Sequence, residues 1–337
     1  MKLETIVIIL TGVMGVMTSL LIVNLITADQ RPQITSVMQL AQPVPTSLPS
    51  PTPTPVCANL LFGGDLMFDR HIREKAQARG SYDFILAGVE DLLFRADGII
   101  ANLEGPVTDF PSRSVGSAVG STNNYFFTFD PLVLDNLRQW PFVLSLGNNH
   151  MLNFGQNGLE QTYQNLNEKE LNYFGYVQPD QVSPSYIVHK FNDINVGLVN
   201  YNQFVTGGEE RAISDLKTVR PLVEIVIVYA HWGNEYVPEN QVQRQLAQEF
   251  IDLGADLVVG AHPHVVQGSE VYQGKQIYYS LGNFVFDQYF QPEVQQGLLV
   301  EARLCRNTAE GFTWQFTEHP TKILRTGETV LAESLNQ

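Results

Sequence analysis

Two histidines on either side of a proline are the residues of this sequence that point most directly to chemistry. His262 and His264 flank Pro263, and the preceding residues VVGA are typical of a buried strand. Because proline disfavours the helical region for the residue before it, we expect His262 to be extended, and residues two apart on an extended chain point to the same side. A single buried histidine is usually a hydrogen-bonded core residue, whereas two that share one face indicate metal ligands.

Other polar side chains also follow apolar runs that are predicted as strands. They are Asp65, Glu104, Asn149, His150 and His231. In open α/β sheets, ligands lie beyond the carboxyl ends of the strands, so we expect these side chains and the two histidines to meet in one pocket. Carboxylate, amide and imidazole donors suit first-row transition ions, and two ions about 3.5–4 Å apart use about this many ligands. A single acidic residue after a strand is more often a helix cap or turn residue. The predicted metal site therefore depends on the repeated occurrence of such side chains at strand ends.

The remaining histidines are not part of this pattern of polar residues at strand ends. His71, His189 and His319 follow no comparable strand end, and we interpret them as surface or packing residues.

Apolar runs that alternate with helical stretches predict a mixed α/β fold. The predicted helices cover residues 84–95, 132–139, 158–169 and 239–253. The predicted strands cover residues 60–63, 98–104, 142–150, 186–190, 194–200, 223–229, 256–260, 276–281 and 296–304. Because strands outnumber helices, we expect two sheets, with a loop rich in serine and glycine at residues 110–124.

The composition argues against nucleic acid as a partner, and it does not decide whether the two cysteines form a disulfide. Twenty Lys and Arg against thirty-five Asp and Glu give a net charge of −15, which argues against nucleic-acid binding. An anionic partner would need a locally positive site, and bound divalent ions provide one. Cys57 and Cys305 form no zinc motif; outside the cytoplasm they could pair, but the sequence does not show whether they come close enough.

The amino-terminal part predicts a membrane anchor and a spacer. Residues 6–26 contain no charged side chain, and as a helix they would span about 31 Å, enough for a bilayer core. A cleaved secretory signal is the alternative. We therefore expect an anchor at residues 1–30, a linker rich in Pro, Thr and Ser at residues 31–56, and one folded domain at residues 57–337. The domain would lie outside the cytoplasm of a single-pass membrane protein.

Six motifs occur in order along the chain and resemble one known family. They are GGDLMFDR, ANLEGPVTD, SLGNNHMLNFG, AHWGNEY, GAHPHVVQG and YSLGNFVFDQ, within residues 58–288. The chain resembles the CapA family of poly-γ-glutamate capsule biosynthesis, which is similar to the calcineurin-like metallophosphatases. The resemblance implies a four-layer α/β/β/α sandwich with two divalent ions (Mn, Fe, Zn or Co) at the strand ends.

The resemblance also implies a role for each motif residue. Asp65 and His264 would hold the first ion, Glu104 would bridge, Asn149, His231 and His262 would hold the second, and His150 would stabilise the transition state or protonate the leaving group. Trp232, Glu235 and Asn283 would shape the substrate pocket, or serve loop structure only.

Two departures from the pattern leave the function open. The phosphatases begin with Asp-x-His, but Leu66 and Met67 follow Asp65 here, so one imidazole ligand is absent. Asn153 stands where CapA relatives commonly have an aspartate. The first hypothesis is a metal-dependent hydrolase acting on a phosphoester or on an anionic polymer such as poly-γ-glutamate. The alternatives are a non-catalytic subunit that binds and exports the polymer together with other capsule synthase subunits, and a metal-free structural domain.

Overall fold

The computed structural model describes residues 55–181, 185–307 and 311–333. The predicted anchor at residues 1–30 and the predicted linker up to residue 54 lie outside these residues. Across the described part of the chain, no helix combines the length and the apolar composition that crossing a bilayer requires.

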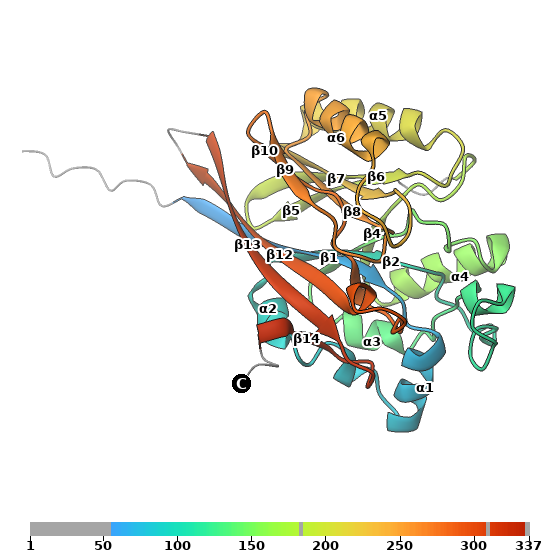
Figure 1. The fold of residues 1–337 in the computed structure, drawn as a ribbon. Coiled ribbons are helices and arrows are strands. Elements are labelled where there is room, and N and C mark those ends of the chain that lie inside the picture. The colour runs from blue at the N-terminus through green and yellow to red at the C-terminus, as the bar shows by residue number, and fades with distance from the viewer. Residues whose placement is uncertain (1–54, 182–184, 308–310, 334–337) are drawn as a thin grey trace, which may run out of the picture. The chain divides into compact units, whose positions relative to one another are not determined.

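Two sheets form the centre of the described domain (Figure 1). In spatial order, the first contains β14 (Thr329–Leu331), β13 (Gly311–Ile323), β12 (Gln296–Asn307), β1 (Val56–Leu66), β2 (Gly98–Leu103), β3 (Phe142–Ser145) and β4 (Asn172–Phe174). The short strand β11 (Asn283–Val285) also pairs with β1. The second contains β5 (Tyr186–Phe191), β6 (Ile194–Asn202), β7 (Ile225–His231), β8 (Leu257–Ala261), β10 (Lys275–Tyr278) and β9 (Ser269–Tyr272).

The centre of each sheet is parallel, which determines where the polar residues emerge. Strands β1 to β4 run parallel in the first sheet, and β6, β7, β8 and β10 run parallel in the second. Antiparallel strands extend both sheets at their edges. Parallel neighbours end at the same edge of a sheet, so residues that follow successive strands become neighbours in space.

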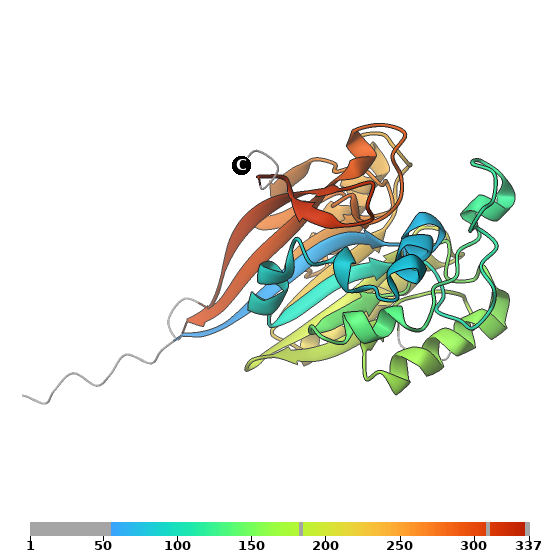
Figure 2. The same cartoon turned by 90° about the horizontal axis from the view of Figure 1, so that it is seen from below.

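Helices cover the outer face of each sheet. The first sheet carries α1 (Arg70–Arg79), α2 (Glu90–Arg95), α3 (Val133–Leu137) and α4 (Gly155–Glu168), and the second carries α5 (Gly208–Val219) and α6 (Gln241–Asp252). Short 3-10 turns lie at η1 (Asp83–Ile85), η2 (Thr122–Tyr125), η3 (Arg220–Leu222) and η4 (Glu293–Gln295). Figure 2 shows the first group of helices lying across its sheet, on the side away from the second sheet.

Alternation along the strands divides the apolar residues among three buried clusters. In β1, Leu61 packs toward the helices, whereas Leu60 and Phe62 pack between the sheets. In β7, Ile227 packs between the sheets and Val228 packs against α5 and α6. Successive side chains of a strand point to opposite faces, so both faces of a central strand are buried and its sequence is almost entirely apolar. The two sheets and their helices confirm the mixed α/β prediction.

The elements differ from the prediction in several places. The predicted helix at residues 84–95 is broken, because Gly88 forms a β-bridge with Val330; a 3-10 turn covers Asp83–Ile85 and the α-helix covers only Glu90–Arg95. Helices α1 and α5 and the long strand β13 were not predicted. Val56, predicted as the last linker residue, is the first residue of β1 and pairs with Arg306.

Cys57 and Cys305 form a disulfide. They lie directly opposite each other on the antiparallel pair β1 and β12, with a Cα–Cα distance of 4.1 Å. The bond ties the first strand of the domain to a strand 248 residues later in the sequence. It therefore closes nearly the whole described domain into one covalent loop, which restricts the unfolded chain.

Candidate metal centre

The predicted ligands come together at the carboxyl ends of strands from both sheets. The first sheet contributes Asp65 near the end of β1, Glu104 directly after β2, and Asn149 in the loop after β3. The second contributes His231 at the end of β7, and His262 and His264 after β8. Oxygen donors therefore come mainly from one sheet and imidazoles from the other.

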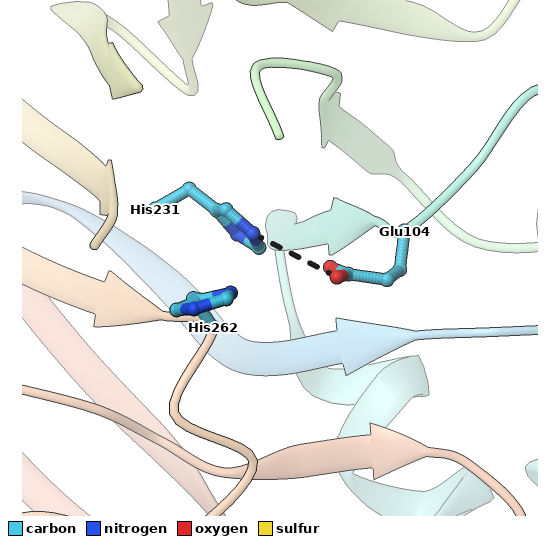
Figure 3. Close-up of side chains that lie close together, drawn as sticks. All are labelled: Glu104, His231 and His262. Carbon is cyan, nitrogen blue, oxygen red and sulfur yellow. Dashed lines mark ion pairs between the residues drawn. The ribbon is translucent and has the colours of Figure 1, made fainter. Parts of the chain in front are cut away.

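Three of these residues form a compact buried cluster (Figure 3). Glu104, His231 and His262 each offer a ligand atom, and these atoms all lie within 4.8 Å of one another. The Nε2 atom of His231 is 3.7 Å from Oε1 of Glu104 and 2.8 Å from Oδ1 of Asn149. Glu104 and His231 are fully buried, and His262 is 4% exposed. Asn149 thus extends the cluster to four donors.

The cluster contains polar atoms that the protein itself does not satisfy. Glu104 Oε1, His231 Nδ1 and His262 Nδ1 are buried and have no hydrogen-bond partner. Each such atom costs about 1–3 kcal/mol when it stays unpaired. A cation between them would satisfy carboxylate and imidazole together, and this donor set suits a first-row divalent ion. The residues present therefore fit the metal that the motifs imply.

Asp65 and His264 form a second, smaller group. The Oδ2 atom of Asp65 is 3.3 Å from Nδ1 of His264 and accepts a hydrogen bond from the His262 backbone N–H at 3.1 Å. The other oxygen of Asp65 accepts from Asn102 at 2.8 Å. Met67, which stands where the phosphatase pattern has a histidine, is fully buried in the apolar cluster under α1. This group has two candidate ligands of its own.

The backbone at the two histidines is not extended. His262 has φ +97° and His264 has φ +57°, both in the left-handed region that residues other than glycine rarely adopt. The prediction that Pro263 makes His262 extended is therefore wrong. The rings nevertheless face one site, with centroids 5.9 Å apart. Backbone strain of this kind is common at ligand-binding positions, where the surrounding fold holds it in place.

Burial moves the pKa values of the two carboxyl groups apart. Burial raises the pKa of Glu104 well above its usual range, and the charge of Asp65 raises it further. For Asp65, burial also acts to raise the pKa, but the hydrogen bond and charge of His264 outweigh it, and the pKa lies below the usual range. Without a cation, the pair therefore holds one ionised and one protonated carboxyl group. A divalent ion would favour the ionised form of both.

His150, His231 and His262 are neutral at pH 7. Burial, followed by the charge of His264, lowers the pKa of His262 to about 3. Burial, followed by the charge of His262, lowers the pKa of His231 well below its usual range. The pKa of His150 is also lowered to about 3. Burial is the largest cause, followed by the charges of His264, His262 and Arg70. Neutral imidazole is the form that binds metal.

Hydrogen bonds determine which nitrogen of His150 carries the proton. Its Nδ1 is 3.2 Å from Nδ2 of Asn153, and the same Nδ2 donates to the Tyr125 carbonyl at 3.1 Å. A carbonyl only accepts, so the amide nitrogen of Asn153 is the donor in both contacts. His150 Nδ1 is then an acceptor, and the proton sits on Nε2, which is 3.9 Å from Oε1 of Glu104. His150 therefore directs an N–H toward the centre.

Two of the predicted pocket residues are buried. Trp232 is 1% exposed and packs in the core under α5 and α6, where its indole N–H donates to the Tyr279 carbonyl at 2.8 Å. Asn283 is fully buried, and its Oδ1 lies 2.9 Å from Nδ1 of His264. Both side chains are buried and bonded within the protein, so each supports neighbouring structure, and their predicted role in shaping the substrate pocket stays a prediction. Glu235 is exposed, and its charge contributes to the raised pKa of Glu104.

Two asparagines that were not predicted connect the ligands. Asn102 donates to Asp65 and to Oε2 of Glu104, and Asn148 donates to Oδ1 of Asn102 at 3.0 Å. Asn102 precedes Glu104 by two residues, a spacing that places both on one side of an extended chain. That spacing was a signal in the sequence. Asn148 carried no comparable signal beyond its position beside Asn149.

The histidines outside the motifs lie away from the cluster. His71 has a side chain 57% exposed and lies beside Glu74, His189 packs on Phe191, and His319 contacts Glu301 across β12 and β13. Their positions agree with the predicted surface and packing roles.

Comparison with known proteins identifies relatives with similar sequences. The family model "Bacterial capsule synthesis protein PGA_cap" matches residues 59–288. Capsule biosynthesis protein CapA of Bacillus anthracis is 31% identical over 245 residues, which are 67% of this chain and 59% of that protein. PGA biosynthesis protein CapA of Bacillus subtilis (strain 168) is 30% identical over 263 residues, which are 73% and 67% of the two chains. The matched part thus spans less than two thirds of the first relative.

Solved structures give only distant likenesses. A hypothetical protein from Thermus thermophilus has a TM-score of 0.45 at 14% identity, over 77% of this chain and 99% of that one. A phosphatase from Mycoplasma pneumoniae has a TM-score of 0.45 at 12% identity, over 84% and 98%. Scores below 0.5 carry no conclusion about this chain, so membership follows from the sequence match. On that match, which confirms the resemblance carried by the six motifs, the chain belongs to the bacterial capsule synthesis protein family PGA_cap.

Proposed function

We propose that this chain is a metal-dependent hydrolase of the bacterial envelope. Its substrate would be an anionic polymer such as poly-γ-glutamate, or a phosphoester. The observation that carries the proposal is the buried cluster of Glu104, His231 and His262, in which one side-chain polar atom of each residue lacks a hydrogen-bond partner. The names of the two Bacillus relatives, which refer to capsule and PGA biosynthesis, support the polymer.

The proposed location is the outer side of the cell membrane. The uncharged residues 6–26 would anchor the chain, and the proline-rich residues 43–55 would hold the domain away from the bilayer. The disulfide between Cys57 and Cys305 supports this location, because disulfides persist in oxidising compartments and are rare in the cytosol. Other capsule synthase subunits would be partners in the membrane.

The ligands divide between two proposed ion positions. Glu104, Asn149, His231 and His262 would hold one divalent ion, and Asp65 and His264, with Glu104 as the bridge, would hold another. Manganese, iron, zinc and cobalt all fit these donors. Such ions supply Lewis acidity, which polarises a phosphoryl or carbonyl oxygen and lowers the pKa of water.

His150 is the proposed catalytic side chain. Asn153 keeps the proton of its ring on Nε2, so the neutral imidazole offers an N–H to the oxygen on which negative charge develops. A buried, preorganised donor of this kind is worth about 10²–10³ in rate. Protonation of a leaving group would require an anionic substrate to raise the pKa of His150 from about 3.

The test combines metal analysis with turnover. The full chain, purified in mild detergent, would be loaded with each of the four metals and assayed on bis(p-nitrophenyl) phosphate and on poly-γ-glutamate. We expect stoichiometric metal and turnover that His150→Ala lowers by about 10²–10³ without removing metal. His189→Ala is the matched control, because that histidine is remote from the cluster and packs on Phe191.

One observation favours a non-catalytic alternative. Met67 occupies the position of the missing imidazole, so the group around Asp65 and His264 is incomplete. A protein that only binds and exports the polymer would not need a complete two-metal centre. Retained polymer binding without turnover in any of the four metals would replace the hydrolase proposal with this one.

A further inference from the structure

An arginine in the first motif lies in the wall of the metal centre without a role so far. Arg70 is the first residue of α1, and its side chain is 12% exposed. Its backbone has φ +50°, which residues other than glycine rarely adopt. A buried charge in a strained conformation is costly unless the fold holds it there for a purpose.

Two aromatic rings place the guanidinium of Arg70 next to the site. Its Cζ atom lies 5.1 Å from the ring centroid of Phe127 and 5.4 Å from that of Phe286. Phe127 in turn packs on His150, with centroids 4.4 Å apart, and Phe286 packs on His264, with centroids 4.8 Å apart. Each ring beside Arg70 thus touches a different histidine of the centre. The cation is held by these rings, and its charge reaches His150, whose pKa it helps to lower.

Asp287 fixes the guanidinium but leaves donors free. Nη2 of Arg70 pairs with one oxygen of Asp287, whose other oxygen accepts from the His71 backbone N–H at 3.1 Å. Nη1 makes only long contacts of 3.4 Å to Asn124. The buried Nε has no hydrogen-bond partner. Since guanidinium has five N–H donors, the pair with Asp287 leaves enough for a bidentate contact with an oxyanion.

We propose that Arg70 is the residue that recognises an oxyanion of the substrate, carboxylate or phosphate, beside the metal centre. This inference rests on the proposed function insofar as the substrate is anionic. The chain carries a net charge of −15, and the site itself contains the carboxyl groups of Asp65 and Glu104. An anionic substrate therefore needs fixed positive charge at the site. Arginine matches a planar oxyanion with two parallel hydrogen bonds, which a lysine cannot reproduce.

Arg73 provides a matched control on the same helix. Its side chain is 11% exposed, close to the 12% of Arg70. Its Nη1 donates to the Thr128 carbonyl at 3.0 Å, and its other contacts are to Asp69 and Asp130. Replacing Arg73 removes a buried cation from α1 without touching the rings that pack on His150 and His264. If Arg70 only supported the fold, as a buried cation of α1, then replacing Arg70 and replacing Arg73 should change the binding of the probes to the same extent.

The experiment measures binding and does not depend on turnover. Full-length protein in mild detergent, loaded with Mn²⁺, would be titrated calorimetrically with inorganic phosphate and with γ-linked triglutamate. We expect Arg70→Gln to weaken binding of at least one probe by about tenfold or more, because a charge-assisted bidentate contact is lost. Arg70→Lys should recover part of the affinity, and Arg73→Gln should bind as the wild type does. Metal content and unfolding midpoint, measured on each variant, show that the centre is intact.

The outcomes separate this inference from the proposed hydrolase activity. Loss for phosphate alone identifies a phosphoester, and loss for triglutamate alone identifies the carboxylate polymer; both support Arg70. If Arg70→Gln does not fold, Arg70→Lys decides, because it keeps the charge and loses only the planar fork. Wild-type affinity in the folded Arg70 variants, equal loss in Arg73→Gln, or no binding of either probe by the wild type would overturn the inference. Arg70-dependent binding without turnover would overturn the hydrolase and leave the inference standing.

Discussion

The two halves of the metal centre satisfy their polar atoms in different ways. The His231 half consists of Glu104, Asn149, His231 and His262, and three of its buried polar atoms have no partner in the protein. The Asp65 half consists of Asp65 and His264, in which both carboxylate oxygens and the His264 Nδ1 already bond to Asn102, to the His262 backbone and to Asn283. A cation relieves unpaired atoms in the first half and competes with existing hydrogen bonds in the second. We therefore infer that the His231 half binds its ion more tightly.

Removing one imidazole from each half gives the largest expected contrast. His231→Ala should weaken binding of the tight ion by more than about 100-fold, because changes to residues that merely support a ligand already cost about 10–100-fold. His264→Ala should leave about one equivalent of metal bound. Metal analysis of the dialysed full chain measures both. Equal metal loss in the two variants would contradict the difference between the halves.

Acid should destabilise the metal-free protein through the same buried histidines. His150, His231 and His262 have pKa values lowered from 6.5, so below pH 6.5 the unfolded chain binds more protons than the folded one, and stability falls as the pH falls. Glu104 acts in the opposite direction, because its raised pKa keeps it protonated in the folded state. Because three histidines act in one direction and one carboxyl group acts in the other, the balance is a net loss of stability between pH 7 and pH 5.

Thermal unfolding in chelator measures this loss. The melting temperature should fall from pH 7 to pH 5. In His262→Gln, a control that keeps a polar side chain but cannot titrate, the fall should be smaller. A melting temperature that stays constant or rises over this range would show that the histidines are not buried in the neutral form, and the account of the His231 half would then fail.

The comparison also shows what the sequence could predict. The donors at strand ends were predictable, because Asp65, Glu104 and His231 each follow an apolar run and parallel strands end at one edge. The left-handed backbone of His262 and His264 was not, because it depends on contacts that hold a local conformation against its own preference. Asn283 was predicted in the pocket, but it is the hydrogen-bond partner of His264. A motif shows that a residue is near the site and does not show which way its side chain points.

The fold was predictable where a strand or helix has a regular apolar pattern. Helix α6, predicted at residues 239–253, is found at Gln241–Asp252, where its Asn240 cap bonds to the Gln243 N–H. The helix predicted at residues 84–95 failed at Gly88, which pairs with Val330 from the far end of the chain. Local periodicity cannot report a contact of that range, because the partner lies in a separate part of the sequence.

Asn283 offers a smaller test within the Asp65 half. Its Nδ2 donates to the carbonyls of His264 and Val294, so its Oδ1 must accept from Nδ1 of His264, which leaves Nε2 of that ring as the ligand atom. Asn283→Leu should weaken binding of the ion in the Asp65 half by about 10-fold and leave binding of the tight ion in the His231 half unchanged. Competition titration with a chelator measures both affinities. Weakening of the tight ion instead would mean that the halves are not independent.

The smallest expected effect concerns His150, which lies beside Glu104 of the His231 half. Asn153→Asp replaces a donor to Nδ1 with a carboxylate, which favours the charged imidazolium and should raise the pKa of His150 above about 3. The proton should also move from Nε2 toward Nδ1, so the N–H directed at Glu104 would be lost in the neutral ring. Nitrogen-15 NMR of the histidine rings measures the tautomer and the pKa without any need for turnover. Asn153→Leu, which removes the donor without adding charge, separates the two effects: it should relax the tautomer while leaving the ring neutral at pH 7. If neither variant changes the His150 signals, Asn153 does not position that ring, and the His231 half contains metal ligands without an oriented donor.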